Sequence, residues 1–453
     1  MDSRRHARLR STRSAKRVLE FGTDGVRGRA NSELTVEFAQ RLGQSVAASV
    51  LGSSFVVGRD TRVSGTMLQA AFSAGLCSRG VSVLDLGVIP SPGVAFICAK
   101  LRLPGAVISA SHNPYFDNGI KIIGAAGTKL STESEAEIEK LLREGTGFGT
   151  EEIGVVVGAP DLVDDYVNFL CTVPIVGTLS GMKVVVDAGH GAASKLARRV
   201  FESYGAQVVV INDSPDGENI NAESGSTYLV PLQDAVAAEA ADVGLAFDGD
   251  ADRVLAVDEQ GGVMDGDCIM AVVATYLQSL DRLRHSTIAV TVMSNMGLTV
   301  ALRRQGISVI ETDVGDRNVS EAMVRHDLSL GGEQSGHIIL SEIASTGDGI
   351  LTGLVLCAAL RSFAQKASET AGSAMNRYPQ VLENIRYDGD PRTRLADPEV
   401  LEAIRAHADA LGSEGRILVR PSGTEPLIRV MVEARLDTVA RAVVDDLCKK
   451  ILG

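Results

Sequence analysis

The chain has 453 residues, more than one hydrophobic core usually supports, so several domains are expected. Hydrophobic residues make up 45% of it, yet no apolar run reaches the roughly 18 residues of a membrane span, which argues against a membrane protein. A net charge of −13 argues against a nucleic-acid partner, because phosphate backbones are bound by clustered Lys and Arg. A small anionic substrate remains compatible with this composition if positive charge is concentrated locally.

The cysteines are scattered and lie mostly in apolar, helix-like runs. They are Cys77, Cys98, Cys171, Cys268, Cys357 and Cys448. This spacing indicates buried thiols in a reducing compartment and neither a disulfide framework nor a CxxC metal site. The expected location is therefore cytoplasmic.

Residues 1–17 are basic and almost free of acidic side chains. A transit peptide has such a composition, but this segment has few apolar residues with which to form an amphipathic face. We interpret it as a disordered basic extension, with targeting as the less favoured alternative.

Three later segments repeat one plan, in which an amphipathic helix ends at a glycine and a β-branched strand follows. The expected helices are 67–79, 196–204 and 298–305, and each is preceded by an apolar strand at 55–58, 183–187 or 288–293. Glycine tolerates the left-handed conformation that ends a helix. Continuous apolar strands between helices indicate mostly parallel sheets covered on both faces. The sequence thus predicts three similar α/β domains, at 18–158, 159–258 and 259–372.

The C-terminal part departs from this plan. A Lys-, Ser- and Gly-rich stretch after Phe363 is interpreted as a linker that ends near Arg377. The remaining segments are expected to be strand 381–387, helix 398–411, strands 415–419 and 428–433, and a last helix from 436. The pattern predicts a small α+β domain at 373–453, suited to closing over a substrate.

The segment 107–121 combines a nucleophile with basic groups. An apolar strand reaches Ile108, and Pro114, Asn118 and Gly119 are expected to keep the following residues out of any helix or strand. The resulting loop would present the Ser111 hydroxyl beside an imidazole and a lysine, His112 and Lys121, which suits covalent catalysis. Taken alone, the segment could equally be an ordinary polar turn.

Three carboxylates follow another apolar strand. Asp248, Asp250 and Asp252 alternate with small residues, so their oxygens can converge from one tight loop. Converging carboxylates repel one another unless a hard cation lies between them, and Mg²⁺ is the ordinary candidate. The alternative is a solvated acidic turn, but Arg253 follows at once and the preceding strand is apolar. An EF-hand is excluded because its 12-residue loop and closing Glu are missing.

Two glycine-supported turns carry further polar groups. The first, at 21–28, contains Arg27. The second, at 330–337, contains Glu333 and Ser335, whose side chains could bind sugar hydroxyls. Without context, a plain polar turn explains the second segment equally well.

The segment 420–429 has the groups that a phosphate needs. Ser422, Gly423 and Thr424 offer hydroxyls and backbone amides, and the guanidinium groups of Arg420 and Arg429 flank them. No GxxxxGK[ST] pattern is present, which disfavours nucleotide hydrolysis. A capped turn is the alternative.

The four loops, in this order on three α/β domains and a small fourth domain, resemble the α-D-phosphohexomutase superfamily from Val18 to the C-terminus. Within it, Ser109 and the segments 291–297 and 420–433 resemble the branch that acts on glucosamine phosphates. Asn318 and Ser224 depart from the pattern of that branch, which bears on the substrate and not on the chemistry. The resemblance implies three mixed α/β sandwich domains with a smaller C-terminal α+β domain and an active site in the central cleft.

The resemblance also implies an isomerase that interconverts glucosamine 6-phosphate and glucosamine 1-phosphate. This reaction would feed the synthesis of UDP-N-acetylglucosamine and cell-wall precursors. Ser111 would carry the phosphoryl group and glucosamine 1,6-bisphosphate would be the intermediate. One Mg²⁺ would be held by Ser111, Asp248, Asp250 and Asp252. A homodimer is left open.

Individual roles follow from the same resemblance. The phosphate of the substrate would lie on Arg420, Ser422, Gly423, Thr424 and Arg429, and its sugar on Glu333 and Ser335. Lys121 would transfer the proton, with Arg27, His112 and Arg253 positioning the phosphoryl group.

Three other functions remain as alternatives. The chain could prefer glucose or mannose phosphates, as phosphomannomutases and phosphoglucomutases do. It could be a metal-dependent phosphatase, in which the first aspartate is the nucleophile and Ser111 is dispensable. It could also be a non-catalytic phosphosugar-binding protein, although such a protein would need neither Ser111 nor the three aspartates.

Overall fold

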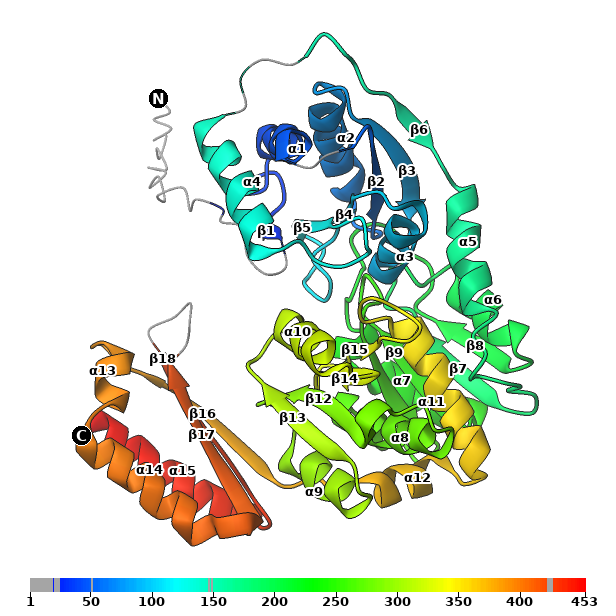
Figure 1. Ribbon diagram of the computed structural model, residues 1–453. Coiled ribbons are helices and arrows are strands. Elements are labelled where there is room, and N and C mark those ends of the chain that lie inside the picture. Colours follow the sequence, from blue (N-terminus) through cyan, green and yellow to red (C-terminus); the bar gives the residue numbers. More distant parts are fainter. Residues whose placement is uncertain (1–18, 20–24, 50–51, 146, 148–149, 422–426) are drawn as a thin grey trace, which may run out of the picture.

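The computed structural model describes residues 19, 25–49, 52–145, 147, 150–421 and 427–453, which form four sheets with their helices (Figure 1). The basic extension at 1–17 lies outside the described residues, and so do Ser422, Gly423 and Thr424.

The first domain is built on a six-stranded sheet in the order β1-β5-β4-β2-β3-β6. Its elements are β1 Val26–Arg29, α1 Val36–Ser49, β2 Ser54–Arg59, α2 Gly65–Cys77, β3 Ser82–Val88, α3 Ser91–Leu101, β4 Gly105–Ile108, β5 Asp117–Ile123, α4 Thr132–Glu144, β6 Val156–Gly158 and α5 Asp161–Leu170. In β2, Phe55 and Val57 pack in the core beneath α1 and α2, whereas Val56 packs on the α3 side. Burial on both faces explains why the strand is apolar throughout.

The second domain has a five-stranded sheet in the order β11-β10-β9-β7-β8. Its elements are β7 Lys183–Asp187, α6 Ala197–Ser203, β8 Gln207–Ile211, the 3-10 turn η1 Gly225–Thr227, α7 Val230–Glu239, β9 Val243–Phe247, β10 Val254–Asp258 and β11 Val263–Met264. The strands β8, β7 and β9 are parallel, and β10 returns antiparallel beside β9. The tight return between β9 and β10 leaves a short loop at the carboxyl end of the parallel strands.

The third domain has a four-stranded sheet in the order β13-β12-β14-β15. Its elements are α8 Gly266–Ser279, η2 Arg284–Ser286, β12 Thr287–Thr291, α9 Met296–Arg304, β13 Ser308–Thr312, α10 Asp316–His326, β14 Leu330–Gly332, β15 Ile338–Leu340, α11 Gly349–Phe363 and α12 Ala367–Ala374. The repeated helix and strand plan of the sequence is present in all three domains as α2–β3, α6–β8 and α9–β13.

The C-terminal domain is a three-stranded antiparallel sheet in the order β16-β18-β17, covered by helices. Its elements are β16 Gln380–Arg386, α13 Pro391–Leu395, α14 Pro398–Leu411, η3 Gly412–Glu414, β17 Gly415–Pro421, β18 Leu427–Ala434 and α15 Asp437–Leu452. The predicted α+β module is confirmed, with α13 as an addition. Asp390 caps that short helix through its side chain, and Pro391 stands at the first helical position.

Together, the α/β sheets contain more parallel than antiparallel pairs of strands, as predicted, and β1, β5, β10 and β15 run antiparallel to a neighbour. Two other sequence-based predictions need correction. Asn118 and Gly119 do not exclude a strand but lie within β5, where a Cβ at Gly119 would stand 2.5 Å from the Ser109 carbonyl. The expected linker after Phe363 contains α12.

The hydrophobic clusters divide the molecule into two bodies. One continuous hydrophobic cluster includes Ile97 of the first domain, Val184 of the second and Leu354 of the third. The C-terminal domain has its own cluster, formed by β16, β18, α15 and their neighbours. The three α/β domains are therefore packed as one body, and the C-terminal domain is an independent unit joined to it (Figure 1).

Within the described residues, no single helix is long and apolar enough to cross a membrane. Taken together, the helices α11 and α12 have the length and apolar composition of a membrane span. However, they are bent by 95° relative to each other, and α11 is a buried core helix.

Candidate active site

Ser111 lies in the loop between β4 and β5, which we call the serine loop (residues 109–116). Its hydroxyl donates a hydrogen bond to Asp248 Oδ2 at 2.6 Å, and the residue is 1% exposed. Its backbone has φ of +53°, in the left-handed region that a non-glycine residue seldom adopts. Such a conformation persists only where neighbouring groups enforce it, and here it directs the nucleophilic oxygen at the second domain.

The three aspartates form a buried cage in the aspartate loop (residues 248–253), directly after β9. One oxygen from each of Asp248, Asp250 and Asp252 lies within 4.8 Å of the others. Asp250 Oδ1 and Asp252 Oδ1 are buried and accept no hydrogen bond from the described residues. Hard carboxylate oxygens gathered within this distance, two of the residues having a buried oxygen that accepts no hydrogen bond, fit a small divalent cation.

The charges in this cage are unequal. Burial and the neighbouring carboxylates of Asp252 and Asp250 raise the pKa of Asp248 well above its usual range. Burial opposes the ionisation of Asp252 as well, but Lys121 and then His337 outweigh it and hold that pKa well below the usual range. Without a cation, Asp248, next to Ser111, therefore takes up a proton more readily than Asp252.

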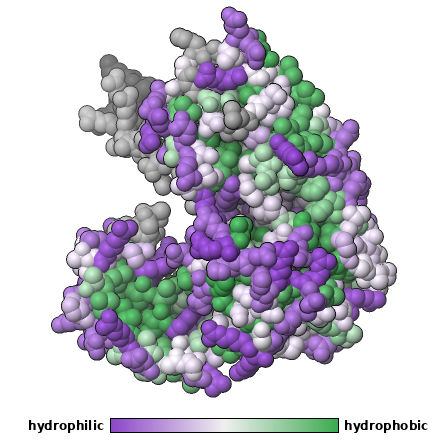
Figure 2. Space-filling view, viewed as in Figure 1, coloured by the Kyte–Doolittle hydropathy of each residue, from purple (hydrophilic) through white to green (hydrophobic). Residues whose placement is uncertain are grey.

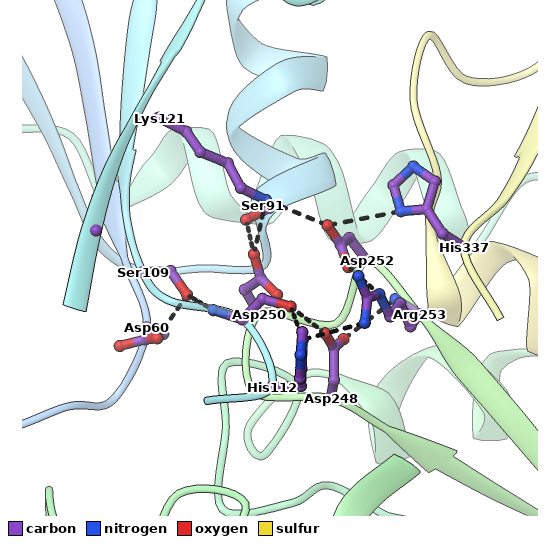
Figure 3. A network of polar contacts seen from close by, with 12 residues as sticks. Asp60, Ser91, Ser109, His112, Lys121, Asp248, Asp250, Asp252, Arg253 and His337 are labelled. Atoms are coloured by element: carbon purple, nitrogen blue, oxygen red, sulfur yellow. Dashed lines mark hydrogen bonds and ion pairs between the residues drawn. The ribbon is translucent and has the colours of Figure 1, made fainter. Parts of the chain in front are cut away.

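Lys121 extends from β5 toward the cage (Figure 3). Its Nζ lies 3.3 Å from Asp252 Oδ2 and 3.5 Å from Asp250 Oδ2. Lys121, which the resemblance makes the candidate for proton transfer, therefore lies beside the aspartate loop.

Arg253 and His112 form a second pair beside Ser111. Arg253 Nη1 lies 3.0 Å from His112 Nδ1, and the same ring nitrogen lies 3.3 Å from Ser111 Oγ. Burial, together with Arg253 and Arg27 of β1, lowers the pKa of His112 to about 4. The imidazole is therefore neutral at pH 7 and can hold a hydrogen bond without adding charge.

The glutamate turn (residues 333–337), between β14 and β15, packs against the aspartate loop. The Gly336 carbonyl accepts a bond from Val254 N at 3.2 Å. Glu333 Oε1 accepts one from Gly315 N at 3.1 Å, and its charge contributes to raising the pKa of Arg253. Ser335 is exposed. Both candidate sugar-binding residues thus belong to a turn that borders the cage.

The described residues of the fourth loop belong to the C-terminal domain and lie apart in their hydrogen bonding from the other three loops. Arg420 and Arg429 face each other across β17 and β18. Arg420 Nη2 lies 3.8 Å from Met293 Sδ of the third domain. Among the described residues of this loop, none hydrogen-bonds the serine loop, the aspartate loop or the glutamate turn.

Several residues of the site were missed by sequence reasoning. Ser91, at the start of α3, donates its hydroxyl to Asp250 Oδ2, and His337 Nδ1 lies 3.6 Å from Asp252 Oδ2. Asp60 accepts from Ser109 Oγ at 2.6 Å beneath the serine loop (Figure 3). A signal for Asp60 existed, since it follows an apolar strand just as Ser111 does, and the carboxyl ends of parallel strands meet at one sheet edge.

A buried serine hydroxyl on a carboxylate cage, flanked by lysine and arginine at the junction of α/β domains, defines a phosphoryl-transfer enzyme. Known proteins agree. Residues 18–147, 164–262 and 265–378 match the family domains described as phosphoglucomutase/phosphomannomutase, alpha/beta/alpha domains I, II and III. Residues 382–450 match the C-terminal domain of the same family.

Curated relatives match over nearly the whole length. The chain is 49% identical over 445 residues to phosphoglucosamine mutase of Desulforudis audaxviator (strain MP104C), covering 95% of this chain and 97% of the relative. It is 50% identical over 441 residues to phosphoglucosamine mutase of Rhodococcus opacus (strain B4), covering 94% and 98%. The chain therefore belongs to the phosphoglucomutase/phosphomannomutase family, and it is a phosphohexomutase, an isomerase.

Solved structures share the fold. A phosphoglucomutase/phosphomannomutase family protein from Burkholderia thailandensis superimposes with a TM-score of 0.81 at 24% identity, covering 96% of this chain and 97% of that one. N-acetylphosphoglucosamine mutase of Aspergillus fumigatus, in complex with GlcNAc-6P and magnesium, gives 0.68 at 17% identity, covering 97% of each chain. At these identities the likeness concerns the fold alone.

Proposed function

We propose that the chain interconverts glucosamine 6-phosphate and glucosamine 1-phosphate through a phosphoryl group carried on Ser111. The observation that carries the proposal is the Ser111 hydroxyl, buried and 2.6 Å from Asp248 Oδ2 within a cage of three carboxylates. The choice of glucosamine rests on the phosphoglucosamine mutases that match nearly the full chain at about half identity.

The cage would hold one Mg²⁺ through Asp248, Asp250 and Asp252, with an oxygen of phosphorylated Ser111 as a further ligand. The two buried oxygens without hydrogen bonds, Asp250 Oδ1 and Asp252 Oδ1, support this assignment. A bound Mg²⁺ supplies positive charge that neutralises the phosphoryl oxygens as negative charge builds up on Ser111 Oγ.

The first transfer forms glucosamine 1,6-bisphosphate. O1 of glucosamine 6-phosphate attacks the phosphorus on Ser111, the new O1–P bond forms, and the P–Oγ bond breaks. Lys121, next to the cage, is the candidate for proton transfer: as a neutral amine it would accept the O1 proton and pass it to Ser111 Oγ, which leaves the phosphorus. Arg253 and Arg27 stabilise the phosphoryl group in flight, and neutral His112 positions it.

The second transfer returns a phosphoryl group to the enzyme. The bisphosphate turns over within the closed site, and Ser111 Oγ attacks the phosphorus at the 6-position. The P–O6 bond breaks, O6 takes the proton that Ser111 Oγ gives up, and glucosamine 1-phosphate leaves. The sugar would be held by Glu333 and Ser335. The distal phosphate would be held by Arg420, Ser422, Gly423, Thr424 and Arg429, in either orientation of the sugar.

The test is a comparison of the wild type with Ser111→Ala. We expect phosphopeptide mapping to find phosphoserine at position 111 of the wild type, and Ser111→Ala to lose turnover while folding normally. Ser279→Ala is a matched control, because among the described residues that hydroxyl bonds just the Tyr276 carbonyl within α8. A Ser111→Ala enzyme with normal turnover would contradict the mechanism. A higher kcat/KM for glucose or mannose 6-phosphate would contradict the substrate only.

A further inference from the structure

We propose that Arg62 is a positioning residue, which holds the serine loop in the conformation that presents Ser111 to the aspartate cage. The inference rests on the proposed function of Ser111 as phosphoryl carrier. Arg62 lies just beyond β2, the strand that neighbours β4, and its side chain is fully buried. A buried guanidinium is rare unless all its donors are used.

The Arg62 side chain bonds four carbonyls of one short segment. Nη2 donates to the Ser111 and Asn113 carbonyls, each at 2.8 Å. Nη1 donates to the Asp117 carbonyl at 3.0 Å and to the Pro114 carbonyl. The planar fork of donors therefore fixes the serine loop from Ser111 to the first residue of β5.

Asp60 extends this set of contacts to the backbone amide of Ser111. It accepts from Arg62 Nε at 2.8 Å and from Ser109 Oγ at 2.6 Å. Ser109 Oγ in turn accepts from Ser111 N at 2.9 Å. Both the amide and the carbonyl of Ser111 are thus anchored to one ion pair, which explains how φ of +53° is maintained.

The ion pair acts through geometry and not by attracting the phosphoryl group. Burial raises the pKa of Asp60, and the guanidinium of Arg62 is the largest opposing influence. Since the charge of Arg62 is balanced by a carboxylate 2.8 Å away, little of it acts on Ser111 Oγ. Lysine could not replace this group, because its donors radiate from one point and cannot span the four carbonyls.

A residue of the second domain donates hydrogen bonds to two of the carbonyls that Arg62 holds. Asn221 Nδ2 donates to the Ser111 carbonyl at 2.9 Å and to the Asn113 carbonyl at 3.1 Å. These are the acceptors of Arg62 Nη2, so the loop is held from both domains. Replacing Asn221 therefore provides a second variant, which weakens the hydrogen bonds to the serine loop without leaving a buried charge unpaired.

The experiment measures single turnover on enzyme that carries a radiolabelled phosphoryl group on Ser111, after mixing with glucosamine 6-phosphate. This rate constant does not depend on the fraction of molecules that are folded, so a merely structural defect would not change it. For Arg62→Lys we expect a fall of about 10²-fold, as for a nucleophile displaced by about 1 Å. For Asn221→Ala we expect about tenfold, since its weak bonds are worth about 1.4 kcal/mol together.

The matched control is Arg59→Lys. Arg59 ends β2 and its Nη1 bonds Gln69 Oε1 at 3.1 Å on α2, away from the serine loop. We expect its rate constant, and the KM of all variants for glucosamine 6-phosphate, to stay within about twofold of wild type, because the phosphate-binding domain is untouched. An unchanged rate constant in Arg62→Lys or, if that variant does not fold, in Asn221→Ala would overturn the inference alone. A wild type that transfers no phosphoryl group from Ser111 would overturn the proposed function and the inference together.

Discussion

The serine and aspartate loops and the arginine loop (residues 420–429) belong to two differently built parts of the molecule. In the first two, Ser111 and the three aspartates are buried, the two loops are hydrogen-bonded to each other, and the domains that carry them share a common core. The arginine loop extends from a domain with its own core, and its described residues touch the rest of the chain through Arg420 and Met293. Figure 2 shows the surface hollowed between this domain and the first domain.

The contrast matches two tasks of a mutase. Phosphoryl transfer gains from groups held in place before the reaction, whereas a bisphosphate that must turn over needs room and a clamp that can release it. The C-terminal domain is nevertheless anchored to the third domain through a buried carboxylate. Buried Glu433 of β18 accepts bonds from Asn295 Nδ2 at 3.1 Å and Met296 N at 2.9 Å, both in the third domain.

The largest effect is expected from Asp248→Asn, which removes a charge of the cage while keeping its shape. We expect kcat to fall by at least about 10²- to 10³-fold, the range for losing one preorganised electrostatic group. Because Asp248 is repelled by its neighbours, the metal-free variant should also unfold at a higher temperature than the metal-free wild type. Steady-state kinetics and thermal unfolding in EDTA measure both. The control is Asp388→Asn, because the Asp388 side chain is 97% exposed. An equal loss of kcat in both variants would contradict the proposed role of the cage.

The next effect tests how closely the two buried loops are packed. A Cβ on Gly249 would stand 2.7 Å from the Ser111 carbonyl, so Gly249→Ala must push the serine loop away from the cage. We expect kcat to fall about 10²-fold, as for a misplacement of about 1 Å. Gly372→Ala in α12, where a Cβ meets nothing within 4 Å, should leave activity unchanged. A Gly249→Ala enzyme as active as that control would mean that the loops are not in contact during turnover.

The same contrast separates what the sequence could predict from what it could not. Apolar strands followed by small, polar or acidic residues predicted the ends of β4 and β9, hence Ser111 and the aspartates, because local pattern determines where a strand ends. Asn118 and Gly119 were misassigned because β5 tolerates them through contacts with Ser64 and Ser109. Such contacts between segments far apart in the chain leave no trace in local spacing.

Partners across domains were hidden for the same reason. The segments 291–297 and 420–433 were singled out for their resemblance to one branch, but nothing in either indicated that Asn295 meets Glu433. Arg62 likewise follows a strand end, yet its bonds reach carbonyls about fifty residues away. Backbone carbonyls are present at every residue, so no residue type marks them as acceptors.

A smaller effect is expected from Glu433→Gln at the anchor of the C-terminal domain. Besides its contacts in the third domain, Glu433 accepts from Arg416 Nε at 2.7 Å. Glutamine keeps one acceptor but turns an amide toward donors, so the anchor should loosen. We expect KM for glucosamine 6-phosphate to rise about tenfold, the equivalent of about 1.4 kcal/mol, with single-turnover phosphoryl transfer near wild type. Glu383→Gln, exposed on neighbouring β16, is the control. Loss of single-turnover chemistry in Glu433→Gln would show that the two parts are not separable.

The smallest effect on activity is expected from replacing Asp267, which hydrogen-bonds Asn295, one of the residues that contact Glu433. Its Oδ2 accepts from Asn295 N at 2.7 Å, and burial, with the nearby Asp265 carboxylate, raises its pKa to about 7. In the unfolded chain the pKa is near 3.8, so the folded protein binds the proton more tightly. Its contribution to stability is complete below about pH 4 and is lost as the pH rises to about 7, at about 1.4 kcal/mol per pH unit.

Asp267→Asn should remove this dependence, because asparagine stays neutral and keeps an oxygen for Asn295 N. We expect its midpoint of thermal unfolding to exceed that of the wild type at pH 8, the difference to shrink toward pH 5, and kcat to stay within about twofold. Asp388→Asn should follow the wild type at every pH. If the unfolding midpoints of Asp267→Asn and the wild type changed with pH in parallel, Asp267 would ionise in the folded protein without a loss of stability. The junction with the C-terminal domain would then be better solvated than the buried loops around Ser111.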